Sequence, residues 1–398
     1  MLDLLVQNVI LLDLNTGAER TAAVGVDRGF ISCVIPAGER DNAAADQTAA
    51  SNSGNAGTAQ PMPEARRTID GQGSYLFPGL VDFHTHLFRH GSQFGIDADL
   101  LLSSGVTTAA DMGSAGWVNY PAMYECDLIG KKVRTGSFLN ISPIGQPGRG
   151  ISEPLDAGAV SEEGIDKILA EYPGKVRGLK VRLSRSIVKE LGTGPLRRAV
   201  ELGEKFGLPV CVHTTDPPAP TDEVAAMLRP GDIYSHTYQG VGHHSAETDE
   251  VLKGMLAAQE RGVLIEVGNG RVNFDFPVAE KCIEAGLLPD IISSDATPQT
   301  YHNGPAMWDL ARVASKFLNM GMPIQDVVRA VTSTPARVLR MDHMIGTVAP
   351  GFEADLALFR MKDDPITFCD SAGNERIGAE GFVPVMTIRS GRVVWQQL

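Results

Sequence analysis

Cysteine is scarce in this chain of 398 residues, and its cysteines form no motif. The five cysteines stand singly, with no Cys-x-x-Cys pair, at Cys33, Cys126, Cys211, Cys282 and Cys369. An odd number of scattered thiols argues against a disulfide framework and against a structural zinc knuckle. Reduced thiols are typical of the cytoplasm, which is therefore the expected location.

Positive charge is also in short supply, because 48 acidic side chains outnumber 35 basic ones and give a formal net charge of -13. No basic stripe is available to neutralise phosphates, so neither nucleic acid nor an anionic membrane surface is expected as a partner. No apolar run approaches the roughly 20 residues that a membrane span needs. The apolar start, Met1–Val6, lacks a basic region and contains Asp3, which favours a strand over a signal peptide.

What the chain does contain is a long alternation of apolar runs and amphipathic segments between Gly79 and about Thr334. The apolar runs expected to be strands cover residues 75–83, 106–111, 133–141, 176–181, 209–212, 232–235, 263–267 and 291–294. Helical patterns such as 196–206, 247–261 and 277–285 lie between them. Eight strands with crossovers over about 250 residues predict an α/β fold, a (β/α)8 TIM-like barrel, and strands this apolar are expected where both faces are covered.

Both ends of the chain have the character of β structure. We expect residues 1–78 and 336–398 to supply the two halves of one small β-sandwich domain. Residues 79–335 would then form the barrel as an insertion between these halves. Between 41 and 65 the small and polar residues Ala, Asn, Ser, Gly, Thr and Gln dominate, and this composition predicts a mobile loop.

The first barrel strand ends in two histidines, His84 and His86, separated by one residue. Side chains alternate along a strand, so both imidazoles are expected on the same side, where they can hold one transition metal. In such a barrel the chemistry lies at the C-terminal ends of the strands. There the fifth strand ends in His213, the sixth in His236 and the eighth in Asp295. Core histidines and a helix-capping aspartate could explain each residue singly, but four of only nine histidines fall at these positions.

Lys180 on the fourth strand is the most specific residue of this set. An ammonium ion cannot ligate a metal, but a buried neutral lysine can react with carbon dioxide to form a carbamate, in effect a long carboxylate. We expect this carbamate to bridge two divalent metals, with His84, His86 and Asp295 on one metal and the later histidines on the other. A hydroxide shared by the metals would be the nucleophile, and Asp295 would shuttle its proton.

These residues resemble the amidohydrolase superfamily over nearly the whole chain. The resemblance is carried by the segment Phe77-Pro-Gly-Leu-Val-Asp-Phe-His-Thr-His, by the strand-four lysine and later histidines, by Ser293-Ser294-Asp295, and by the closing Gly346-Thr-Val-Ala-Pro-Gly-Phe-Glu-Ala-Asp-Leu. Shorter segments resemble a dihydroorotase-like amidohydrolase/deacetylase group within it: 105–108, 111–116, 140–142, 178–182 and 236–240. This resemblance implies a dinuclear zinc site with carboxylated Lys180, and hydrolysis of an acyl ester or amide next to a carboxylate.

The sequence departs from that group at two places. Dihydroorotases carry an arginine two residues after the second histidine, where this chain has Phe88 followed by Arg89. This weakens a dihydroorotase interpretation. After the seventh strand the group usually shows Gly-His-Gly, but here it is Gly268-Asn269-Gly270. The contact made by that histidine is expected to be altered, and the substrate with it.

Substrate contacts are expected from the loops, and the partner is expected to be a small anionic molecule. Tyr238 is a candidate donor to the carbonyl oxygen. Arg149, Arg182 and Arg271 are candidates to grip a carboxylate, and His302 is a further loop candidate. Homo-oligomers are common among large barrels, and the sequence leaves the oligomeric state of this one open.

Three other functions compete with a deacetylase. A cyclic amidohydrolase of the dihydroorotase or hydantoinase type is the nearest alternative. A mononuclear deaminase would need no lysine on the fourth strand and would usually place a glutamate where Asp216 stands, three residues after His213. A non-catalytic barrel partner would be expected to have lost ligands, and every expected ligand is present.

Overall fold

A computed structural model describes residues 1–37, 62–362 and 364–397 of the chain. Most of the predicted mobile loop, residues 41–61, lies outside the described residues. At the end of that segment, Glu64 accepts a backbone hydrogen bond from Leu2 at 2.8 Å, and Ala65 forms a parallel bridge with Leu2. No helix in the described ranges has the length and apolar character that a membrane crossing requires.

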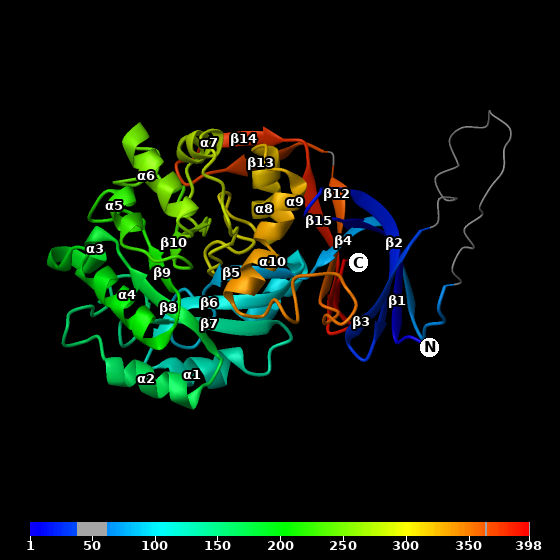
Figure 1. Cartoon of the computed structure of the whole chain (residues 1–398), viewed down its shortest axis with the longest axis horizontal. Coiled ribbons are helices and arrows are strands. Elements are labelled where there is room, and N and C mark those ends of the chain that lie inside the picture. The colour runs from blue at the N-terminus through cyan, green and yellow to red at the C-terminus, as the bar shows by residue number, and fades with distance from the viewer. Residues whose placement is uncertain (38–61, 363, 398) are drawn as a thin grey trace.

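The predicted barrel is confirmed as a parallel sheet of seven consecutive strands that curls on itself (Figure 1). In chain order and spatial order alike, the strands are β5 (Leu80–Thr85), β6 (Val106–Gly116), β7 (Arg134–Asn140), β8 (Val176–Arg182), β9 (Val210–His213), β10 (Ile233–Ser235) and β11 (Leu264–Glu266). Nearly every residue of these strands is buried, as expected where the barrel interior covers one face and helices cover the other.

The predicted eighth strand, 291–294, closes the barrel as an irregular seam rather than as a regular strand. Ile291 bridges Glu266 of β11, and Ala296 bridges Thr85 of β5. Between these bridges the backbone N–H of Ser294 donates to the side-chain carboxylate of Asp82 at 3.0 Å instead of to a backbone carbonyl oxygen of β5. Asp295 then turns to a positive φ of 51°, which breaks the extended backbone.

Helices fill the connections and cover the outside of the barrel. Their bounds are α1 (Tyr120–Met123), α2 (Glu162–Glu171), α3 (Arg185–Val188), α4 (Gly194–Phe206), α5 (Thr221–Ala226), α6 (Asp249–Glu260), α7 (Phe276–Glu284), α8 (Leu310–Asn319), α9 (Ile324–Ala330) and α10 (Ser333–Val338), with short 3-10 or π turns at Ala98–Ser104, Tyr124–Leu128 and Lys189–Leu191. Side-chain caps explain where the longer helices begin: Thr248, Asp275 and Asp309 each accept from a backbone N–H in the first turn.

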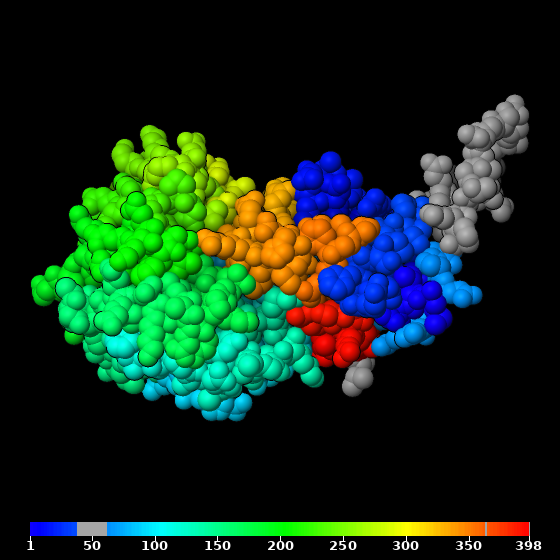
Figure 2. All heavy atoms as spheres, turned by 60° about the horizontal axis from the view of Figure 1, so that its bottom comes forward, coloured from blue at the N-terminus to red at the C-terminus, as the bar shows by residue number. Residues whose placement is uncertain are grey.

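Both chain ends meet in a second sheet beside the barrel, as predicted (Figures 1 and 2). Its strands are β1 (Leu4–Leu12), β2 (Glu19–Asp27), β3 (Phe30–Pro36), β4 (Thr68–Pro78), β12 (Leu356–Lys362), β15 (Gly381–Arg389) and β16 (Arg392–Gln396), in the order β16-β15-β12-β4-β1-β2-β3. A separate hairpin joins β13 (Ile366–Cys369) to β14 (Glu375–Gly378). The predicted run 75–83 is divided at Gly79, where the chain passes from β4 directly into β5.

Candidate metal centre

The end of β5 and the seam bring three of the predicted ligands together. The Nε2 atoms of His84 and His86 lie 3.7 and 3.2 Å from Oδ1 of Asp295. All three side chains are buried, and their donor atoms lie within 4.8 Å of one another. Two imidazole nitrogens and a carboxylate oxygen that converge at this spacing can share one divalent metal.

The other two histidines lie beside this group. His213 ends β9 and His236 follows β10, and their ring centroids are 4.4 Å apart. The His236 ring centroid is also 5.0 Å from that of His84. Nδ1 of His236 donates to the carbonyl oxygen of Gly268 at 2.9 Å, which leaves Nε2 as the bare acceptor. That Nε2 is buried and has no hydrogen-bond partner in the described structure, as expected of a nitrogen placed to bind a metal.

Lys180 lies on β8 with its side chain completely buried. The contact made by its Nζ is 3.5 Å long and goes to the thiol of Cys211, a weak acceptor. An ammonium ion in this setting would be poorly satisfied. The site therefore holds a lysine amine at the predicted strand end, next to histidines and with no carboxylate bound to it in the described residues.

The protonation states suit metal binding. Burial lowers the pKa of His84, His213 and His236, so these rings are neutral near pH 7 and their nitrogens are free to ligate. For Asp295, burial raises the pKa, but the hydrogen bond with His86 and the neighbouring histidines outweigh it and lower the pKa to about 2. The carboxylate is therefore charged. Neutral imidazoles beside a charged carboxylate fit a divalent cation.

Glu266 at the end of β11 is a candidate site residue that the sequence did not lead us to expect. It is fully buried, and its carboxylate accepts from the hydroxyls of Ser235 and Ser293. Nδ1 of His84 lies 3.4 Å from the same carboxylate and 3.3 Å from the Ser235 hydroxyl. Glu266 thus lies behind His84 and orients its ring. A single glutamate inside the apolar run 263–267 was the available signal.

A similar arrangement supports the other ligands. The hydroxyl of Ser114 lies 2.8 Å from Nδ1 of His86, and the backbone N–H of Ser114 donates to the Asp111 carboxylate at 2.8 Å. On the seam, Nδ2 of Asn273 donates to Oδ2 of Asp295 at 2.8 Å. Asp295 therefore keeps Oδ1 toward the histidines while Oδ2 is held from the other side.

The segment Gly268-Asn269-Gly270, which departs from Gly-His-Gly at its middle residue, has a clear structural role. A Cβ at Gly268 would lie 2.6 Å from Nδ1 of His236, and one at Gly270 would lie 2.3 Å from Oδ2 of Asp295. Both glycines also have positive φ, so the loop packs directly against two of the candidate ligands. The Asn269 side chain is buried and accepts from Nζ of Lys316 at 2.8 Å.

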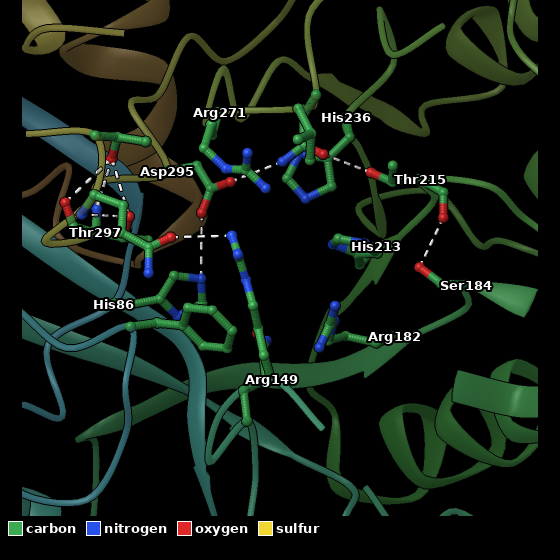
Figure 3. A pocket seen from close by; sticks show the side chains of 16 residues that line it. His86, Arg149, Arg182, Ser184, His213, Thr215, His236, Arg271, Asp295 and Thr297 are labelled. Atoms are coloured by element: carbon green, nitrogen blue, oxygen red, sulfur yellow. Dashed lines mark hydrogen bonds and ion pairs between the residues drawn. The ribbon is translucent and has the colours of Figure 1, made fainter. Parts of the chain in front are cut away.

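A cavity of about 240 Å³ opens above these residues and is lined by His86, His213, His236 and Asp295. The three predicted arginines, Arg149, Arg182 and Arg271, also line it, together with polar residues such as Gln146, Ser184, Thr215 and Gln299. Figure 3 shows Arg149 reaching between His86 on one side and Arg182 and His213 on the other. The cavity therefore combines a candidate metal centre with cationic walls that suit an anion.

Two predicted substrate contacts are wrong. Tyr238 is completely buried, packs against Phe274 and Phe317, and donates its hydroxyl to the carbonyl oxygen of Leu287, so it cannot reach the cavity. His302 is stacked between Tyr301 and Trp308 and lies 3.4 Å from Asp309, away from the cavity lining.

Comparisons with known proteins agree with this geometry. Residues 75–394 match the model of the Amidohydrolase family. A deacetylase of Agrobacterium fabrum is 34% identical over 321 residues, which cover 80% of this chain and 78% of that protein. A deacetylase of Brucella anthropi is 34% identical over 312 residues, covering 77% of this chain and 76% of that protein.

A solved structure described as a dihydroorotase superposes with a TM-score of 0.87 at 28% identity, covering 99% of this chain and 98% of that one. A second, described as an adenine deaminase, gives a TM-score of 0.86 at 25% identity and covers both chains completely. The barrel, the converging donor atoms and the family match lead to one conclusion: the chain is a hydrolase that belongs to the amidohydrolase family.

Proposed function

We propose that this chain is a binuclear-metal hydrolase that cleaves the acyl ester or amide bond of a small acylated carboxylic acid. The observation that carries the proposal is the convergence of His84, His86 and Asp295 at the floor of an arginine-lined cavity. The two bacterial relatives named deacetylases support the acyl group as the part that is removed.

The side chains that converge here are the ones that would hold the metals. His84, His86 and Asp295 would hold one ion, and His213 with His236 would hold the other. Lys180, carboxylated by carbon dioxide, would supply the shared carboxylate between them. Zinc is the metal that this donor set favours. When bound, the metals supply an activated water and polarise the acyl carbonyl.

The protein's own groups would position the substrate and move the proton. Asp295 would accept the proton of the attacking water on Oδ1 and pass it to the leaving oxygen or nitrogen, while Asn273 holds Oδ2. Because the pKa of Asp295 is about 2, this transfer depends on position more than on basicity. Arg271 and Arg149 would bind the substrate carboxylate, since Arg182 is already paired with Glu153.

A cyclic amidohydrolase activity is the second candidate, favoured by the similarity to the dihydroorotase structure. The loop after β5 argues against dihydroorotate itself. Phe88 is buried, and Arg89 is 61% exposed on the surface, 3.9 Å from Asp97. Phe88 occupies the position where dihydroorotases carry their arginine, and Arg89 does not line the cavity.

The decisive experiment compares kcat/KM of the zinc-loaded enzyme on the O-acetyl and N-acetyl derivatives of one α-substituted carboxylic acid. Preference for the ester would make it a deacylating esterase, and preference for the amide an N-acyl amino-acid deacylase. Turnover of neither compound, with turnover of a cyclic imide or ureide, would replace the proposal by its alternative.

Asp295→Asn should lower kcat by at least about 10²-fold with metal content retained, since the amide cannot accept the proton. The measurements are steady-state kinetics and metal analysis of the purified variant. Asp342→Asn, on the surface, is the matched control and should behave as the wild type. A near-normal kcat in Asp295→Asn would remove this residue from the mechanism.

A further inference from the structure

A second cavity adjoins the catalytic one. Its volume is about 450 Å³, and it shares Phe94, Arg149 and Arg182 with the lining of the catalytic cavity. Its remaining walls come from residues 148–153, after β7, and from residues 186–189, after β8. Both segments follow the C-terminal ends of barrel strands, where substrates of such barrels bind. The substrate thus has space to extend well beyond an acetyl group and a single carboxylate.

Arg182 lies between the two cavities and is held in place by an ion pair. Arg182 forms an ion pair with Glu153, whose side chain is only 4% exposed. The guanidinium of Arg182 is therefore already paired with a carboxylate of the protein. Arg149 differs, because its Nη2 donates to the neutral amide oxygen of Gln299 at 3.0 Å. A carboxylate of the substrate would be a stronger acceptor for Arg149 than this amide.

Charge in the joined cavities is strongly unbalanced. Arg149 lines both cavities, Arg271 lines the catalytic one, and Lys189 lines the second. Among the described residues none of these three cations forms an ion pair with a carboxylate. This occurs in a chain whose formal net charge is -13, so the local excess of cations is opposite in sign to the rest of the molecule. Even with Asp295 counted, a substrate with one carboxylate would leave part of this charge unmatched.

Between the charged groups the second cavity also presents apolar side chains. Ile151 is 50% exposed, and it lines this cavity with Ile187 and Phe94. A short hydrocarbon segment that crosses this surface would cover it and carry a second charged group to Lys189.

We propose that the enzyme acts on a dicarboxylic acid acylated on its α oxygen or nitrogen. The α-carboxylate lies against Arg271 beside the metal centre, and the distal carboxylate lies in the second cavity between Arg149 and Lys189. This inference rests on the proposed acyl hydrolysis and names its substrate class.

The test compares acetylated glutamate with acetylated glutamine, both as N-acetyl compounds and as the corresponding O-acetyl 2-hydroxy acids, on the zinc-loaded enzyme. The distal amide removes the charge and keeps the size. We expect kcat/KM at least about 10-fold higher for the dicarboxylate, in line with a hydrogen bond between charged groups. In Lys189→Met the ratio of the two values should fall several-fold. Lys132→Met, in the exposed turn before β7, is the matched control and should keep the ratio.

Equal kcat/KM for the two compounds, or an unchanged ratio in Lys189→Met, would overturn the dicarboxylate assignment and leave the deacylase function standing. If neither compound is hydrolysed, the acyl hydrolysis fails, and the second cavity is judged by calorimetric titration of the same zinc-loaded protein with glutarate and butyrate. Tighter binding of glutarate that Lys189→Met weakens would support the subsite. Equal binding would reject it.

Discussion

Glu266 lies where it would orient one ligand of the candidate metal site. Its carboxylate is buried between two serine hydroxyls and lies behind His84, so it favours the ring orientation in which Nε2 faces Asp295. Carboxylates behind ligating histidines commonly fix the tautomer and raise the basicity of the ligand.

Glu266→Gln should therefore weaken metal binding by about 10- to 100-fold, because the amide is uncharged and presents only one acceptor. Competition with a chromogenic chelator would measure the affinity directly, without reference to turnover. Glu260→Gln, exposed at the end of α6, is the matched control. Equal affinity in both variants would reduce Glu266 to a packing role.

At the scale of elements, the loop 268–273 is held from behind by α8. Nζ of Lys316 donates to Asn269 and to the carbonyl oxygens of Ala306 and Cys369, and it lies 4.1 Å from the ring centroid of Phe274. Lys316 is 3% exposed, and burial lowers its pKa from 10.5 to about 7. The altered Gly-Asn-Gly motif is thus part of a packed unit with a buried lysine.

This lysine should make stability depend on pH. Between pH 7 and about pH 10 the unfolded chain keeps a proton on Lys316 that the folded protein has lost, so the free energy of unfolding rises with pH in this window. Lys316→Met should lose this slope. Urea denaturation at pH 7 and pH 9 should show the wild type gaining up to about 2–3 kcal/mol more than the variant. Parallel pH dependence in the two proteins would contradict the assignment.

Regular elements were predictable because apolar runs and helical periodicity are local. The runs at 106–111, 133–141 and 176–181 became β6, β7 and β8, and the pattern 277–285 became α7 with a one-residue shift. The convergence of the candidate ligands could also be expected, because parallel strands end at one edge. Glu266 and Lys316 could not be located this way, since a single charge within an apolar pattern acquires its partners only from distant elements. Tyr238 and His302 failed for the related reason that spacing in a loop does not give side-chain direction.

At the scale of the whole molecule, four charged residues join the barrel to the second sheet. Arg134 at the start of β7 and Arg389 at the end of β15 both contact Glu353 and Asp355, which precede β12. The two arginines are 16% and 17% exposed, and Asp355 is 2% exposed. Such a mostly buried network is costly to break, because one lost partner leaves a desolvated charge.

Arg134→Met should lower the free energy of unfolding by about 3 kcal/mol. The comparison is Arg28→Met, which removes a surface pair whose arginine is 88% exposed and should change stability by less than about 0.5 kcal/mol. Urea denaturation of both variants checks the difference. If the two variants were equally stable, the network would contribute no more than an ordinary surface pair.

The barrel closes at the seam of residues 291–296, and the candidate ligands come from both sides of this closure. His84 belongs to β5 and His86 follows its end, whereas Asp295 belongs to the seam itself, where its backbone N–H donates to the His84 carbonyl oxygen at 2.8 Å. The candidate ligands therefore come together only where the barrel closes. If these residues hold the metal, a nascent or partly unfolded chain in which residues 291–296 are not yet in place would lack the full ligand set and would not hydrolyse its substrate until the whole barrel had formed.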